Sequence, residues 1–94
     1  MERGEKRRAR RVQVEWPVTA ITADRTMQGE TTNVSTSGAF IRCQKPLRLK
    51  EECLLKLRTP SDSIKANAVV VWSNIDIYED ETIPVGMGVS FIWI

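Results

Sequence analysis

Arginines crowd one short segment near the start of the chain, where residues 7–11 read RRARR. A guanidinium is planar and permanently charged, so it can bind a phosphate or a carboxylate through two parallel hydrogen bonds and can stack on a flat ring. Residues 1–11 hold six basic and two acidic side chains, a net charge of +4, whereas residues 12–94 hold eight basic and ten acidic ones, a net charge of −2. The sequence therefore predicts a basic arm on a slightly acidic body, and the partner of such an arm is an anion.

Small polar residues form a second segment of interest, NVSTSG at residues 33–38. Taken alone, it can be a turn at a strand end, in which Asn33 and Ser35 hydrogen-bond the backbone and Gly38 supplies a positive φ. The arginine segment, taken alone, can be a solvated tail or a weak nucleic-acid contact. The alternative is that the two segments are halves of one ligand site, which requires a fold that brings them together.

Several kinds of chemistry are excluded by the residue types. The chain has no histidine, which excludes Ser-His-Asp and Cys-His catalysis and the usual zinc hydrolase sites. Acidic residues cluster between Asp76 and Glu81, in a stretch typical of a solvated loop and not of a cleft for acid-base catalysis. No glycine-rich loop leads into a helix. We expect a protein that is not an enzyme and that holds neither a metal nor a cofactor.

The two cysteines, Cys43 and Cys53, are too few for a disulfide framework. We expect both to be small buried residues, as free cysteine usually is, with a bridge between them as the alternative. The sequence contains neither the apolar region of a signal peptide nor a run of about 20 apolar residues that could span a bilayer. We therefore expect a cytoplasmic protein without membrane insertion.

Apolar and polar residues alternate along much of the chain, which is the pattern of half-buried strands, and no stretch sustains a helical period. Short polar connections such as residues 59–63 favour antiparallel neighbours. An all-β barrel or closed sandwich is predicted, because closure removes exposed strand edges. The expected strands cover residues 12–19, 27–33, 39–43, 53–58, 66–73 and 85–94.

The three tryptophans receive different assignments. Trp16 and Trp93 fall on apparent core faces of the first and last expected strands. Trp72 alternates in step with Ala68 and Val70, which favours a buried position in the barrel, while a position that stacks on a base is the alternative.

The predicted topology relates the two polar segments to each other. In an antiparallel hairpin, the start of the first strand lies beside the end of the second. Arg11 precedes the first expected strand and Asn33 ends the second, so we expect them at the same end of the barrel. The chain is accordingly divided into a flexible basic arm, residues 1–11, and a barrel, residues 12–94.

This combination resembles the PilZ domain family, receptors for the bacterial second messenger cyclic di-GMP. The family has an RxxxR motif before its first strand, matched here by Arg7 and Arg11, and a [D/N]xSxxG motif after its second, matched by Asn33, Ser35 and Gly38. The closing VGMGVSF also looks like the family's last strand, and the resemblance runs from about Glu5 to Phe91. It implies a six-stranded antiparallel, Greek-key-like barrel. Many members add a C-terminal helix, whereas this sequence stops at Ile94, so the helix is dispensable here or the sequence is a truncated piece.

The resemblance also implies a ligand and a role for each matching residue. Cyclic di-GMP carries two guanines and two phosphodiesters, and Arg7 and Arg11 are expected on guanine edges or phosphate. Asn33 is expected to hydrogen-bond a guanine and Ser35 to contact guanine or phosphate, while Gly38 lets the backbone approach closely. We expect an arm that is mobile when empty and wraps over the bound ligand.

Four further residues are supporting candidates for the ligand site. Arg8 and Arg10 add charge to the arm, and Trp72 is the candidate for stacking on a base. Lys6 directly precedes the RxxxR match, at a place that in the family bears on whether one ligand or a stacked pair is bound. A long cation there is compatible with a stacked pair, whose phosphate charge is doubled.

Two other classes of function compete with the receptor. A small nucleic-acid-binding barrel would explain the basic arm, but such barrels present aromatic platforms, and here aromatics are 6% of residues and fall mostly on apparent core faces. A barrel that only binds proteins and no longer uses the motifs is the third possibility. We expect cyclic di-GMP and an unidentified protein effector as partners, rather than nucleic acid.

Overall fold

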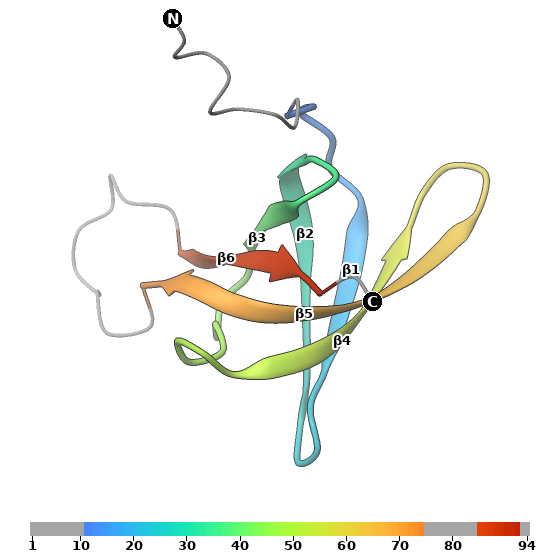
Figure 1. Cartoon of the computed structure of the whole chain (residues 1–94). Helices are drawn as coiled ribbons and strands as arrows, with labels where there is room; N and C mark the ends of the chain where they lie inside the picture. The colour runs from blue at the N-terminus through green and yellow to red at the C-terminus, as the bar shows by residue number, and fades with distance from the viewer. Residues whose placement is uncertain (1–10, 75–84, 93–94) are drawn as a thin grey trace, which may run out of the picture.

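Six antiparallel strands form a closed barrel in the computed structural model, which describes residues 11–74 and 85–92 (Figure 1). Around the barrel they lie in the order β1-β2-β3-β6-β5-β4, so two pairs, β3–β6 and β1–β4, join strands that are not consecutive in the chain. The prediction of an all-β six-stranded barrel is confirmed. Within the described residues no helix is long and apolar enough to cross a membrane. The strands are β1 (Pro17–Ile21), β2 (Thr26–Val34), β3 (Gly38–Arg42), β4 (Glu52–Arg58), β5 (Ser63–Ser73) and β6 (Gly86–Phe91).

The core fills the inside of the barrel with alternate residues from all six strands. Ile41, Leu55, Val70 and Met87 have no exposed surface, and each comes from a different strand. Burying an aliphatic side chain of this size stabilises the fold by roughly 1.5–3 kcal/mol. The alternation of apolar and polar residues in the sequence therefore corresponds to side chains that point alternately into the core and toward solvent.

The connection between β3 and β4 also supplies a core residue. Leu47 is fully buried in the core cluster, and its carbonyl accepts a hydrogen bond from the Ser73 hydroxyl at 2.7 Å. Next to it, the buried side chain of Asn74 accepts a hydrogen bond from the Gly86 amide at 2.8 Å. These contacts satisfy polar groups that burial would otherwise leave without partners.

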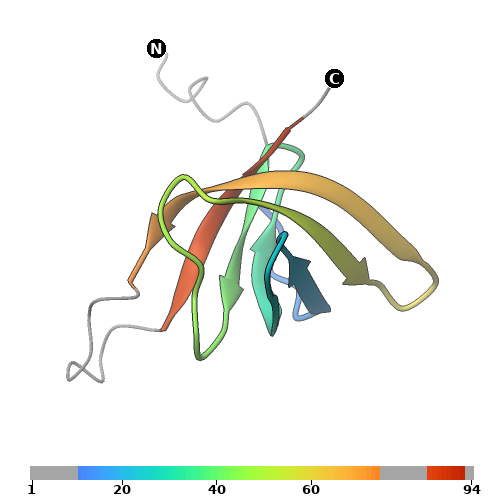
Figure 2. The same cartoon turned by 90° about the horizontal axis from the view of Figure 1, so that it is seen from below.

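The β4–β5 hairpin continues past the barrel wall and projects from it in both views (Figure 1) (Figure 2). Its two strands pair without interruption from Glu52 opposite Val69 to Arg58 opposite Ser63. The turn is closed by Thr59, whose amide and hydroxyl both donate to the carbonyl of Asp62, at 2.8 and 2.9 Å. The turn chemistry predicted for residues 59–63 is therefore present.

The predicted first strand, residues 12–19, is wrong at its start, since β1 begins only at Pro17. The approach to β1 runs beside β2 with an extra residue: Val12 bridges Val34, and Trp16 lies opposite Thr31. The Thr31 hydroxyl, fully buried, accepts from the Trp16 amide at 2.9 Å and donates to the carbonyl of Val14. This side chain takes the place of regular ladder bonds, and the proline has no N–H to extend the ladder.

The tryptophan assignments are only partly met. Trp16 is half-buried and packs against the core without being part of it. Trp93 lies outside the described residues. Trp72, for which a buried barrel position was favoured, is 43% exposed, so that prediction is wrong.

Both cysteines are free and buried, as expected from the sequence. Burial raises the pKa of the Cys43 thiol from its ordinary value of 9.0 to about 11. Burial also raises the pKa of the Cys53 thiol to about 11, with a smaller contribution from the nearby negative charge of Glu51. The folded state therefore keeps both thiols protonated in a range where the unfolded chain begins to ionise them.

We predict that the contribution of the two thiols to the free energy of unfolding is constant well below pH 9.0 and is lost as the pH rises from 9.0 toward 11. The unfolded thiols lose protons first, which favours the unfolded state by on the order of 2 kcal/mol per cysteine at the upper limit. Urea unfolding across this range measures the slope. The Cys43→Ala/Cys53→Ala variant is the control, and an equal slope in that variant would contradict the assignment.

We predict a loss of about 2–5 kcal/mol in unfolding free energy for Leu47→Ala, because a fully buried leucine leaves a cavity. Leu49→Ala is a matched control, two residues away and 55% exposed, and should change stability little. Chemical denaturation of both variants tests whether the β3–β4 connection belongs to the core. Equal effects would show that it does not.

Candidate functional site

Four residues from four neighbouring strands form a row on the outer face of the barrel. Asn33 of β2 pairs with Phe40 of β3, Phe40 with Gly88 of β6, and Gly88 with Trp72 of β5. Directly paired residues project to the same face, and Ala39 and Ile41 on either side of Phe40 point inward. At about 4.8 Å between strands, the row extends over roughly 14 Å.

Two β-bulges place the ends of this row outside the barrel. In β2 the register with β3 shifts between Thr31 and Asn33, so Thr31 points inward while Asn33, two residues later, points outward. In β5 the register with β6 shifts between Val70 and Trp72 in the same way. A regular strand would keep residues two apart on one face. The bulges are therefore the reason that Trp72 is exposed and not buried.

The aromatic end of the row is a tilted pair of rings. The ring centroids of Phe40 and Trp72 lie 5.4 Å apart with an interplanar angle of 45°. Gly88 lies between them on β6, where a Cβ would be 3.6 Å from Trp72 Cβ and 3.9 Å from Phe40 Cδ1. The two rings flank a strand position without a side chain, and Trp72 keeps enough exposed surface to contact a flat ligand.

The polar end of the row joins the two sequence segments. Arg11 Nη1 donates to Asn33 Oδ1 at 2.9 Å. The backbone supports this contact, because Val12 and Val34, the next residue on each side, exchange two N–H···O bonds of 2.9 Å. The prediction that Arg11 lies beside Asn33 is confirmed. The other basic candidates, Lys6, Arg7, Arg8 and Arg10, lie outside the described residues.

The segment after Asn33 is a turn closed by Ser35. The Ser35 amide donates to the carbonyl of Gly38 at 2.8 Å, and the Ser35 hydroxyl accepts from the Ser37 amide at 3.2 Å and contacts the Ser37 hydroxyl at 3.1 Å. The backbone-capping role predicted for Ser35 is therefore present. The turn begins directly after β2, two residues beyond Asn33 at the polar end of the row.

Gly38 does not have the positive φ expected of it. Its small size is needed for another reason: a Cβ would lie 2.1 Å from the carbonyl oxygen of Val89 on β6. β3 and β6 approach so closely at this point that no side chain fits. The glycine thus sets the end of the β3–β6 pair, from which the turn leaves.

Phe40 was not singled out by the sequence reasoning, although the signal was present. It lies between two small or aliphatic residues in GAFIR, at the position that alternation assigns to the outer face. On the other flank of the row, Arg42 forms an ion pair with Glu30, which compensates its charge. Among the described residues, no group of three or more Cys, Asp or Glu side chains could hold a metal ion.

We predict that Gly38→Ala lowers the unfolding free energy by about 1–3 kcal/mol, because the added methyl must displace the Val89 carbonyl. Gly88→Ala is the matched control on the neighbouring strand, where the nearest atom is at an ordinary contact distance of 3.6 Å. Its expected change is within about 0.5 kcal/mol. Thermal and urea unfolding of both variants check this, and a tolerated Gly38→Ala would contradict the close approach.

Comparison with known proteins agrees with this geometry. A family model described as the PilZ domain matches residues 5–93. Among solved structures, that of the Bacillus subtilis inhibitor of motility (MotI/DgrA) is similar with a TM-score of 0.74 and 19% sequence identity, a likeness of fold. The match covers 100% of this chain and 44% of that chain. No curated protein matches the sequence. Because the family model covers nearly its whole length, the chain belongs to the PilZ domain family.

Proposed function

We propose that the chain is a receptor for cyclic di-GMP that passes the signal to a protein effector. The observation that carries the proposal is the contact between Arg11 and Asn33 at one end of a row that ends in an exposed tryptophan. The family is one of cyclic di-GMP receptors, and both of its motifs are present in this sequence. The row offers what a cyclic dinucleotide requires: a cation, an amide and an aromatic surface.

Each end of the row recognises a different part of the ligand in this proposal. Arg11 contacts a phosphate or the O6/N7 edge of a guanine, and Asn33 hydrogen-bonds a guanine. Phe40 and Trp72 provide the surface on which a base stacks, with centroids 5.4 Å apart. The Ser35 hydroxyl, at the adjacent turn, contacts guanine or phosphate.

The basic arm completes the site in this proposal. Arg11 is held beside β2 by the Val12–Val34 bridge, so its guanidinium is positioned to contact the ligand first. Arg7, four residues earlier, reaches up to about 13 Å from Arg11 in an extended chain, enough to contact a second part of the ligand. Closure of residues 1–11 over the ligand creates a new surface for the effector.

Further charge on the arm bears on how many ligands bind. Lys6, Arg8 and Arg10 would add to the field around the phosphates, and we propose that they favour a stacked pair of cyclic di-GMP. The activity is recognition without catalysis, in the cytoplasm. The effector is a protein in this proposal, and the likeness to the inhibitor of motility, which covers 44% of that chain, is one of fold.

A nucleic-acid-binding barrel keeps one observation in its favour. The pair formed by the half-buried Phe40 and the exposed Trp72 is a stacking surface of the kind that single-stranded nucleic acid uses, and the sequence alone did not predict it. The same surface beside Arg11 and Asn33 suits a dinucleotide equally. A titration with single-stranded oligonucleotide therefore belongs in the same experiment.

We predict that isothermal titration with cyclic di-GMP shows saturable binding. The Arg7→Ala/Arg11→Ala variant should bind with an affinity lower by about a hundredfold or more, since charge-assisted bonds contribute roughly 1.5–3 kcal/mol each. Asn33→Ala should weaken binding about tenfold. The matched control is Arg25→Ala/Arg48→Ala, which removes the same charge from the opposite end of the barrel at exposed positions. The molar ratio reports whether one ligand or a pair is bound.

Three results would overturn the proposal. They are an absence of binding, an equal loss in the control variant, and tighter binding of a single-stranded oligonucleotide than of cyclic di-GMP. The last would favour the nucleic-acid-binding barrel. A high-salt repeat separates specific contacts from screened attraction, because only the latter collapses at an ionic strength where the Debye length is about 3 Å.

A further inference from the structure

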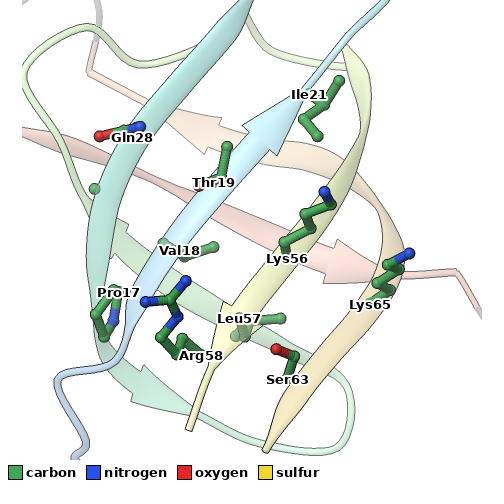
Figure 3. Close-up of a pocket in the computed structure, with 11 residues that line it drawn as sticks. Pro17, Val18, Thr19, Ile21, Gln28, Lys56, Leu57, Arg58, Ser63 and Lys65 are labelled. Carbon is green, nitrogen blue, oxygen red and sulfur yellow. The ribbon is translucent and has the colours of Figure 1, made fainter.

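A basic groove of about 520 Å³ lies on the outer face of β1, β4 and the start of β5, on the other side of the barrel from the Asn33–Trp72 row (Figure 3). The row occupies β2, β3, β6 and β5, so the two surfaces face different directions around the closed barrel. Three cations line the groove: Lys56, Arg58 and Lys65. Among the residues that the structure describes, no acidic side chain lines it.

The positive charges in the groove are uncompensated. Lys56 pairs directly with Lys65 across β4 and β5, an arrangement of like charges that destabilises a sheet. Arg58 lies two residues from Lys56 on the same face, about 7 Å away. In the part of the chain that the structure describes, none of the three forms an ion pair, whereas Arg25 and Arg42 both do.

The remaining lining of the groove is mixed: Thr19, Gln28 and Ser63 are polar, and Pro17 and Ile21 are apolar. Thr19 of β1 lies directly opposite Lys56, whereas Val18 and its partner Leu57 are buried in the core beneath the groove. The Lys56 and Lys65 amines lean the same way from neighbouring strands (Figure 3). Within residues 11–74 and 85–92, no aromatic residue lines the groove, so the described lining offers no platform on which a base could stack.

We propose that this groove binds an extended acidic segment of a partner protein. Side chains on one face of an extended peptide recur about every 7 Å, which matches the spacing of Lys56 and Arg58 along β4. Carboxylates at that spacing meet the cations, and the intervening side chains point away from the barrel surface. The cost of facing Lys56 with Lys65 is then offset when the segment is bound. This inference goes beyond cyclic di-GMP recognition and does not rest on it.

The test uses the full chain and a fluorescein-labelled heptapeptide that alternates glutamate and valine, followed by fluorescence anisotropy at low and high salt. We expect binding that weakens with salt and that Lys56→Gln/Lys65→Gln reduces about tenfold or more. The matched control is Lys45→Gln/Arg48→Gln, which removes two exposed charges from the β3–β4 connection and should leave binding unchanged. A peptide with glutamine in place of glutamate should not bind.

Two additional readouts make the result decisive. Lys65→Glu should raise the Tm, because a cross-strand ion pair replaces a repulsive pair, while it abolishes peptide binding. Cyclic di-GMP binding should be unchanged in all groove variants, which separates this site from the row. The proposal is overturned if the heptapeptide does not bind or if both double variants weaken it equally. It is also overturned if single-stranded oligothymidylate binds more tightly than the peptide and with the same dependence on Lys56 and Lys65.

Discussion

Register is the constraint on which the surface of this protein depends. In a closed barrel each side chain faces either the core or the solvent, and pairing on both sides prevents a strand from rotating to change that. One inserted residue is the means of moving a side chain from the inside to the outside. The bulges in β2 and β5 do this on the two sides of one surface, and they expose Asn33 and Trp72 on the same row. The geometry of the candidate site is a result of these two insertions.

A buried hydroxyl helps to hold the segment before β1, together with the backbone bonds between Val12 and Val34. Thr31 bonds the backbone at Trp16 and at Val14, and it does so from a position with no exposed surface. The approach to the barrel is thereby held against β2 before any regular pairing begins. Because this segment leads directly back to Arg11, a core contact fixes the location of an exposed charge.

Much of the fold could be predicted from the sequence, because period-two alternation and turn residues carry that information directly. The strand set, the buried cysteines and the meeting of Arg11 with Asn33 all follow from such local patterns. The face of Trp72 could not be predicted, since a bulge is one residue long and leaves the alternation on either side intact. The steric requirement for glycine at position 38 could not be predicted either, because it depends on the distance to Val89 in a strand some fifty residues later along the chain.

The close approach of β3 and β6 at Gly38 affects what each motif residue indicates about ligand binding. A glycine there is demanded by the packing of β3 on β6, whether or not the barrel ever meets a nucleotide. Ser35 likewise forms a hydrogen bond within its own turn, where its hydroxyl accepts from the Ser37 amide. Arg11 and Asn33, by contrast, hydrogen-bond each other, and Asn33 Nδ2 also donates to the neighbouring Thr32 hydroxyl, so neither contact involves the core. In a relative of this chain, the packing of the barrel would therefore suffice to explain the glycine, and the turn would explain part of the need for the serine. The arginine and asparagine would be the residues that indicate retained ligand binding.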